Sequence, residues 1–442
     1  MSGYYQSPFL EQDLPTAFST RPIPSPFNPS ASRQDSALDA PGADVEPAQK
    51  SKTVSKKRRP SGNSQSDVSY HHYFFKHDAD HFLHVHLIEE ALLFDPLLYA
   101  VVGFAAFQYR VKHGHGDSLE FLEYYNKSVS TLRQSLASGE PHKDGTMLTV
   151  LQLATFEEYM GDFVSLLSHQ QAAFRMLLEL YNTDSILESE LRRKVLEWYL
   201  KFDITSSIMS GNETAASRGW FSSIADYYRG LTSQCPENID YKIETAIGDH
   251  RLTCVDMTTM FARFSKGEIT PEDFKIKCES FSQELNRWRD KLDPVFSDDR
   301  YRMWIFSNRS REENDIVDPF MAGGLYKGPL ATFNFMTADW IAILAMFKYK
   351  KALLLGETLP PELPELALEL CRIFEAIEYS PELPPEAVLK AQGILGVASL
   401  FLPKDERHTM WCRRKLAKIE ALGYASSDSD CLFILYSEDR LR

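Results

Sequence analysis

Cysteine is scarce in this sequence, with six among 442 residues. Even the closest of them, such as Cys235 and Cys254, are 19 positions apart, and no Cys-x-x-Cys pair occurs. This spacing argues against both a metal knuckle and a disulfide scaffold. We therefore expect a reducing compartment, in which the thiols pack as small apolar groups. The six are Cys235, Cys254, Cys278, Cys371, Cys412 and Cys431.

Long uninterrupted apolar runs are also missing. The start of the chain is polar and aromatic, without the basic, apolar and small-residue succession of a signal peptide. The best candidate for a membrane span, residues 91–107, is interrupted by Asp95-Pro96 and is shorter than the about 20 residues that a span needs. We expect a soluble protein that does not bind membranes.

The common signatures of catalysis are absent as well. The sequence contains no Gly-x-Ser-x-Gly elbow and no His-Glu-x-x-His motif, and residues 323–329 lack the glycine order of a phosphate-binding loop. Adjacent carboxylates such as Glu157 and Glu158 diverge by about 100° on a helix and cannot share one site. We predict that the protein is not an enzyme and holds no cofactor.

Negative charge dominates most of the chain. Residues 1–69 carry 8 Lys and Arg against 7 Asp and Glu, which leaves 40 against 55, or −15, for the remainder. Phosphate repels such an acidic body, so affinity for nucleic acid cannot come from its bulk surface.

Residues 1–69 are rich in Pro, Ser, Asp and Gln, a composition that predicts a disordered segment. It contains a basic cluster at positions 50–59, including the consecutive cations Lys56, Lys57, Arg58 and Arg59. An exposed run of this kind suits the acidic groove of an import receptor, and we interpret it as a nuclear-import signal. The alternative is a solvated charge run in a linker.

From Tyr70 onward the apolar periodicity is helical, with no convincing run of alternating strands. Asp95 is expected to cap a helix that starts at Pro96. Gly161 separates two helices so briefly that they must form an antiparallel hairpin. We predict an all-α fold, an irregular array of antiparallel helix pairs forming one large domain over residues 70–442. Helices are expected at 97–107, 119–136, 146–160, 162–181, 187–209, 239–265, 271–291, 330–355, 364–377, 385–402 and 404–422.

Several short motifs follow one another in a specific order. Asp95-Pro-Leu-Leu-Tyr-Ala is followed by Thr146-Met-Leu-Thr-Val-Leu-Gln-Leu, Glu157-Glu-Tyr-Met-Gly-Asp and His169. Later segments are Trp198 with Phe202-Asp203, Ser210-Gly-Asn-Glu-Thr, Trp340 with Tyr349, and residues 407–424. Over residues 70–430 this series resembles the fungal-specific transcription factor domain, the helical region that normally follows a six-cysteine, two-zinc DNA-binding cluster.

The resemblance implies a nuclear regulator of transcription, controlling a metabolic gene set, that dimerises with itself or with related regulators. Aromatic residues make up 12% of the chain and could line an apolar cavity for a small-molecule inducer, but core packing explains them without a ligand, and we prefer that interpretation. The zinc cluster needs six cysteines in about thirty residues, yet no cysteine precedes Cys235. Direct DNA binding is therefore unsupported. Two alternatives stay open: a gene model that lacks an upstream cluster exon, and a cytoplasmic helical scaffold or small-molecule sensor that shares the domain.

Polar residues in apolar surroundings are the remaining candidates for a site. Six of the twelve histidines lie between positions 71 and 86, and His77, His81 and His84 would share one helix face, with Asp78, Asp80 and Glu89 as further ligands for zinc. Aromatic residues are interleaved with these histidines, as core residues would be, which favours a polar helix face over a metal-binding cluster. We therefore expect no metal site. We interpret Glu157 and His169, on neighbouring helices, as buried structural hydrogen-bonding groups.

Overall fold

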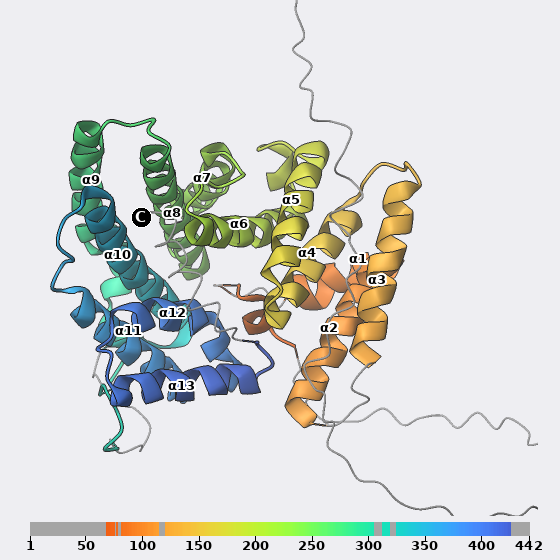
Figure 1. The fold of residues 1–442 in the computed structure, drawn as a ribbon. Helices are drawn as coiled ribbons and strands as arrows, with labels where there is room; N and C mark the ends of the chain where they lie inside the picture. Colours follow the sequence, from red (N-terminus) through yellow and green to blue (C-terminus); the bar gives the residue numbers. More distant parts are fainter. Residues whose placement is uncertain are drawn as a thin grey trace, which may run out of the picture. The chain divides into compact units, whose positions relative to one another are not determined.

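A computed structural model describes residues 68–75, 77, 81–114, 120–304, 312–318 and 324–425 (Figure 1). These residues belong to a compact unit formed by Asp67–Arg442. The basic run at positions 56–59 lies outside the described residues, as does the rest of the segment expected to be disordered except Val68 and Ser69.

The all-α prediction is confirmed. Strand structure in the described residues is limited to a pairing of two dipeptides, β1 (Arg302–Met303) with β2 (Leu325–Tyr326). A π-helical turn, Phe82–His86, precedes the first α-helix. The thirteen α-helices of the described part are α1 (Leu87–Leu93), α2 (Asp95–His113), α3 (Glu120–Ala137), α4 (Asp144–Met160), α5 (Phe163–Leu180), α6 (Glu190–Ser210), α7 (Arg218–Gln234), α8 (Ile239–Ser265), α9 (Pro271–Asn286), α10 (Phe333–Leu355), α11 (Leu363–Glu378), α12 (Gln392–Phe401) and α13 (Glu406–Ala421).

Local sequence explains most helix ends. Gly161 takes a left-handed conformation with φ 69° and ends α4, and Asp162 then begins α5 by accepting a hydrogen bond from the Ser165 amide at 3.1 Å. The expected cap at Asp95 is wrong by one position, because the capping residue is Phe94 and Asp95 lies in the first turn beside Pro96. In the first turn, the Asp95 carboxylate still stabilises α2 by interacting with the positive end of the helix dipole.

Neighbouring helices in the chain pack against each other, notably α2 with α3, α4 with α5, and α7 with α8. The predicted array of helix pairs is therefore confirmed, and Figure 1 shows α2 and α3 side by side, away from α9 and α10. One member of these pairs, α7, is missing from the sequence prediction. The signal was present in the sequence, because the buried residues Trp220, Phe221, Ile224 and Tyr228 recur at helical spacing on one face of α7, the helix that packs against α8.

Two helices form the centres of the packing. Almost every residue of α4 from Gly145 to Tyr159 is buried, since α4 contacts α1, α2, α3, α5 and α6. Helix α10 is likewise surrounded by neighbours, because it contacts α8, α9, α11 and α12. Among the described residues, the segment that is long and apolar enough to cross a membrane is Gly328–Leu355, which contains α10, and not residues 91–107. Its apolar 18-residue stretch is 78% buried inside the protein. Apolar residues on all sides of a helix are expected where neighbours surround it.

Candidate functional site

Buried polar groups link α3 and α4 at Glu157, a residue that the sequence pattern singles out. The Tyr125 hydroxyl donates a hydrogen bond to the Glu157 carboxylate, and Glu157 is only 2% exposed. Burial raises the pKa of Glu157 to about 7, against the opposing effect of the Tyr125 hydrogen bond. Ionisation of this carboxyl therefore falls near neutral pH, where it changes the charge of the core.

His169 has a separate environment on α5. Its Nδ1 lies 3.0 Å from the Ser165 carbonyl oxygen, and burial lowers the pKa of His169 to about 4. The imidazole is thus neutral at pH 7. The hydrogen bonds of Glu157 and His169 go to Tyr125 and Ser165 respectively, so their geometry is that of structural groups in the core.

Asp203, part of the motif that follows Trp198, closes the turn between α6 and α7. Its carboxylate accepts hydrogen bonds from the amides of Ala215 and Ala216 at 2.8 and 2.9 Å, and from the Gln170 side chain at 2.8 Å. Burial raises the pKa of Asp203, although the two amides and the Gln170 side chain act against this rise. The motif residue therefore holds the chain that leads into α7.

A buried ion network joins α6 to α7 and α8. Lys194 Nζ donates to Glu197 at 3.0 Å and to Glu244 at 3.1 Å, and the Tyr228 hydroxyl donates to Glu197 at 3.0 Å. Burial acts to lower the pKa of Lys194, but the two carboxylates outweigh it and raise the pKa. Such a network aligns helices, because each charge would be costly without its partners.

A cavity of about 280 Å³ lies among α7, α8, α9 and α10. The indole rings of Trp288 and Trp340 stack at its wall, with centroids 4.6 Å apart. Its charged lining is paired, since Arg218 makes two hydrogen bonds to Asp256 at 2.7 and 3.0 Å. The polar and charged lining residues are Arg218, Arg229, Asp249, Thr253, Asp256, Glu284 and Lys291.

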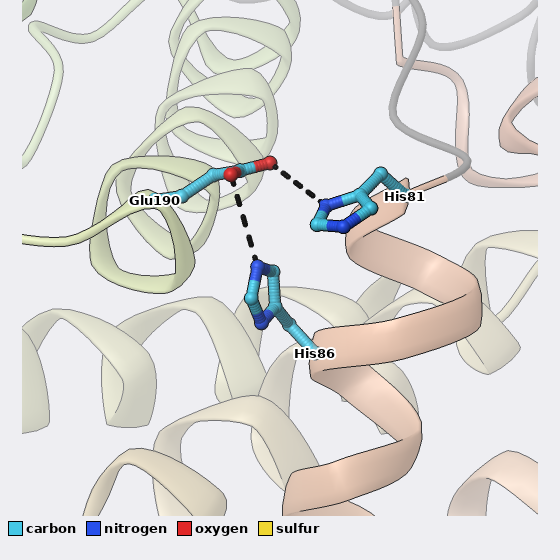
Figure 2. Close-up of side chains that lie close together, drawn as sticks. All are labelled: His81, His86 and Glu190. Atoms are coloured by element: carbon cyan, nitrogen blue, oxygen red, sulfur yellow. Dashed lines mark hydrogen bonds and ion pairs between the residues drawn. The ribbon is translucent and has the colours of Figure 1, made fainter.

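The histidines do not form the face expected from the sequence. His77 pairs with Asp240 at 3.2 Å, whereas His81 and His86 approach Glu190 at the start of α6 (Figure 2). The grouping of His77, His81 and His84 is therefore wrong, because residues 82–86 form a π-helical turn rather than the α-helix assumed. Asp78 and Asp80 lie outside the described residues.

Sequence comparison adds one finding. The model of the fungal specific transcription factor domain matches residues 67–302, from before the π-helical turn to β1. No curated protein and no solved structure matches the chain. The match contains the motifs between Asp95 and Thr214, whereas Trp340 and residues 407–424 lie beyond it.

Proposed function

The chain belongs to the family of the fungal specific transcription factor domain, and we propose that it is a nuclear regulator of transcription that acts through protein contacts of its helical domain. The observation that carries this proposal is the family match over residues 67–302. The family consists of regulatory domains of transcription factors and is not a family of enzymes.

Contact with DNA would be made through a partner. The acidic body, −15 over residues 70–442, repels phosphate. A homodimer, or a heterodimer with a related regulator that carries a zinc cluster, would place this domain at a promoter. Support comes from α1, where Leu92 and Leu93 are 71% and 82% exposed, an adjacent apolar pair that is costly to leave in water.

Nuclear import would depend on Lys56, Lys57, Arg58 and Arg59. Replacing all four with alanine in a fluorescent fusion of the full chain should shift it from the nucleus to the cytoplasm, because an import receptor reads clustered positive charge. Replacing the exposed pair Lys275 and Lys277 on α9 is a control for lost charge as such. An unchanged distribution of the fourfold variant contradicts the import role, and a wild-type fusion that stays cytoplasmic favours the scaffold alternative.

The regulatory role is tested by tethering. Fused to an unrelated DNA-binding domain, the full chain should change expression of a reporter gene, whereas alone it should show no sequence-specific DNA binding in a gel-shift assay. Specific binding by the chain alone would show that it reads DNA without a partner. A tethered chain that leaves the reporter unchanged contradicts regulation by this domain.

The cavity with Trp288 and Trp340 favours an inducer-binding function within the same domain. A small flat metabolite that enters it should change tryptophan fluorescence, and Trp340→Ala should abolish that change. Binding of such a ligand without any effect on the tethered reporter would favour the sensor alternative over the regulator.

A further inference from the structure

We propose that His81, His86 and Glu190 form a binding site for a divalent transition-metal ion, for which Zn²⁺ is the best fit. One ligand atom from each residue lies within 4.8 Å of the other two. The site connects the π-helical turn at the start of the domain with the first turn of α6, more than a hundred positions later in the chain (Figure 2).

Two of the distances, measured to the two different oxygens of Glu190, approach those that a small ion imposes, whereas the three-residue set as a whole lies within 4.8 Å. Glu190 Oε1 lies 3.4 Å from His81 Nδ1, and Glu190 Oε2 lies 3.7 Å from His86 Nε2. Zinc bonds of about 2.0–2.1 Å at a tetrahedral centre place neighbouring ligand atoms about 3.3 Å apart. The His81 side chain is 64% exposed and that of Glu190 is 45% exposed. Small movements of these side chains would complete the geometry, and solvent provides the entry path.

The backbone explains how two histidines five positions apart meet. On an α-helix, residues at i and i+5 diverge by about 140°, so they face different ways. The segment Phe82–His86 is π-helical, and its wider turn, with i to i+5 hydrogen bonds, returns position i+5 to the same side. The His81 and His86 ring centroids are consequently 5.0 Å apart. Turns of this rare type occur frequently at functional sites.

The electrostatic surroundings of the three residues also point to a cation. His86 Nε2 is buried and has no hydrogen-bond partner in the described part of the protein, although it faces Glu190. The ion pairs of Glu190 among described residues are made with these two imidazoles and not with a lysine or arginine. A metal ion would satisfy both the buried nitrogen and the carboxylate. Each imidazole would bind as the neutral ring, so that a proton on the liganding nitrogen is released to water.

Glu89 lies behind His86, at ion-pair distance and beyond hydrogen-bond distance. Its Oε2 lies 3.7 Å from His86 Nδ1, the ring nitrogen that points away from Glu190. Histidines that bind zinc commonly donate their second N–H to a carboxylate, which orients the ring. Two imidazoles and one carboxylate are a ligand set found in zinc sites that keep a fourth position open for water. Copper(II) is the strongest competitor for such nitrogen ligands.

The test measures metal binding by the full chain, purified without a histidine tag. Isothermal titration with Zn²⁺ should give one site per chain, and Zn²⁺ should raise the melting temperature because it joins two elements of the folded state. His81→Ala and Glu190→Gln should each abolish both effects. Glu89→Gln should weaken binding about 10–100-fold, as loss of an orienting carboxylate does elsewhere.

His84→Ala is the matched control, since His84 is an exposed histidine of the same turn that lies outside the three-residue set. It should bind Zn²⁺ as the wild type does. The exposure of His81 ensures that His81→Ala removes little core packing, and circular dichroism checks its fold. The proposal is overturned if the wild type shows no stoichiometric site, or if the wild type, His81→Ala and Glu190→Gln bind Zn²⁺ equally.

Discussion

Replacing Glu157 with glutamine should change how the stability of the protein depends on pH. Glu157 is buried on α4, where it accepts a hydrogen bond from Tyr125, and burial raises its pKa from 4.5 to about 7. Glutamine has nearly the same shape, still accepts the Tyr125 hydrogen bond and carries no charge at any pH. The substitution therefore isolates the effect of the ionisation.

The magnitude follows from proton linkage. Between pH 4.5 and 7 the folded protein holds a proton on Glu157 that the unfolded chain has lost. The contribution of the protonated Glu157 to stability is therefore complete below pH 4.5 and disappears as the pH rises to 7. At about 1.4 kcal/mol for each pH unit, the loss is about 3 kcal/mol, and it stays constant at higher pH. Glu157→Gln should be about as stable as the wild type at pH 4.5 and about 3 kcal/mol more stable at pH 8.

The assay is urea denaturation of both proteins at several pH values between 4.5 and 8, followed by circular dichroism, with the midpoints converted to free energies of unfolding. Glu123→Gln on the exposed face of α3 is the control, because that carboxylate is in water in the folded and unfolded states alike. A free-energy difference between Glu157→Gln and wild type that does not change with pH would refute the assignment of a proton to this buried carboxyl.

Three further predictions concern stability. Burial lowers the pKa of His169 from 6.5 to about 4, so wild type should lose about 3 kcal/mol as pH falls between these values; His169→Gln, measured by the same urea titrations, should lack that loss. Lys194→Met should cost about 3–5 kcal/mol, because it leaves two buried glutamates without their cation; a midpoint unchanged from wild type would mean that the network contributes nothing. Gly248→Ala should lower the free energy of unfolding by about 1–3 kcal/mol, because its new Cβ would lie 2.9 Å from the Cβ of Ala225. Gly230→Ala is the control for a thermal melt and should not destabilise the protein, because a Cβ at Gly230 would meet no atom within 4 Å.

The helices were predictable from local sequence wherever periodicity and end signals agree. Helix α8 begins and ends at the predicted residues 239 and 265, with Asn238 as its cap. The turn at Gly161-Asp162 and the helix pair it joins were predictable for the same reason, because glycine and aspartate act through their own backbone geometry. Helix α7 was missed although its own sequence has a helical pattern, with Trp220, Phe221, Ile224 and Tyr228 on one buried face.

For the candidate site residues as well, the sequence predicts some properties and the packing of the helices decides others. Glu157 and His169 could be recognised from the sequence as polar groups beside apolar neighbours, but their partners Tyr125 and Ser165 and the opposite pKa changes depend on burial in the assembled helices. The stacked Trp288 and Trp340 come from positions more than fifty residues apart, so no local pattern could place them in one cavity wall.

The absence of a cysteine cluster and the ordered helical motifs were sequence properties, because each depends only on which residues occur and at what spacing. They were sufficient for the family and the fold class. The joining of His81 and His86 to Glu190 was decided by tertiary structure alone. It requires a π-helical turn that changes which residues share a face, and a helix contact that brings a carboxylate from far along the chain to the two rings.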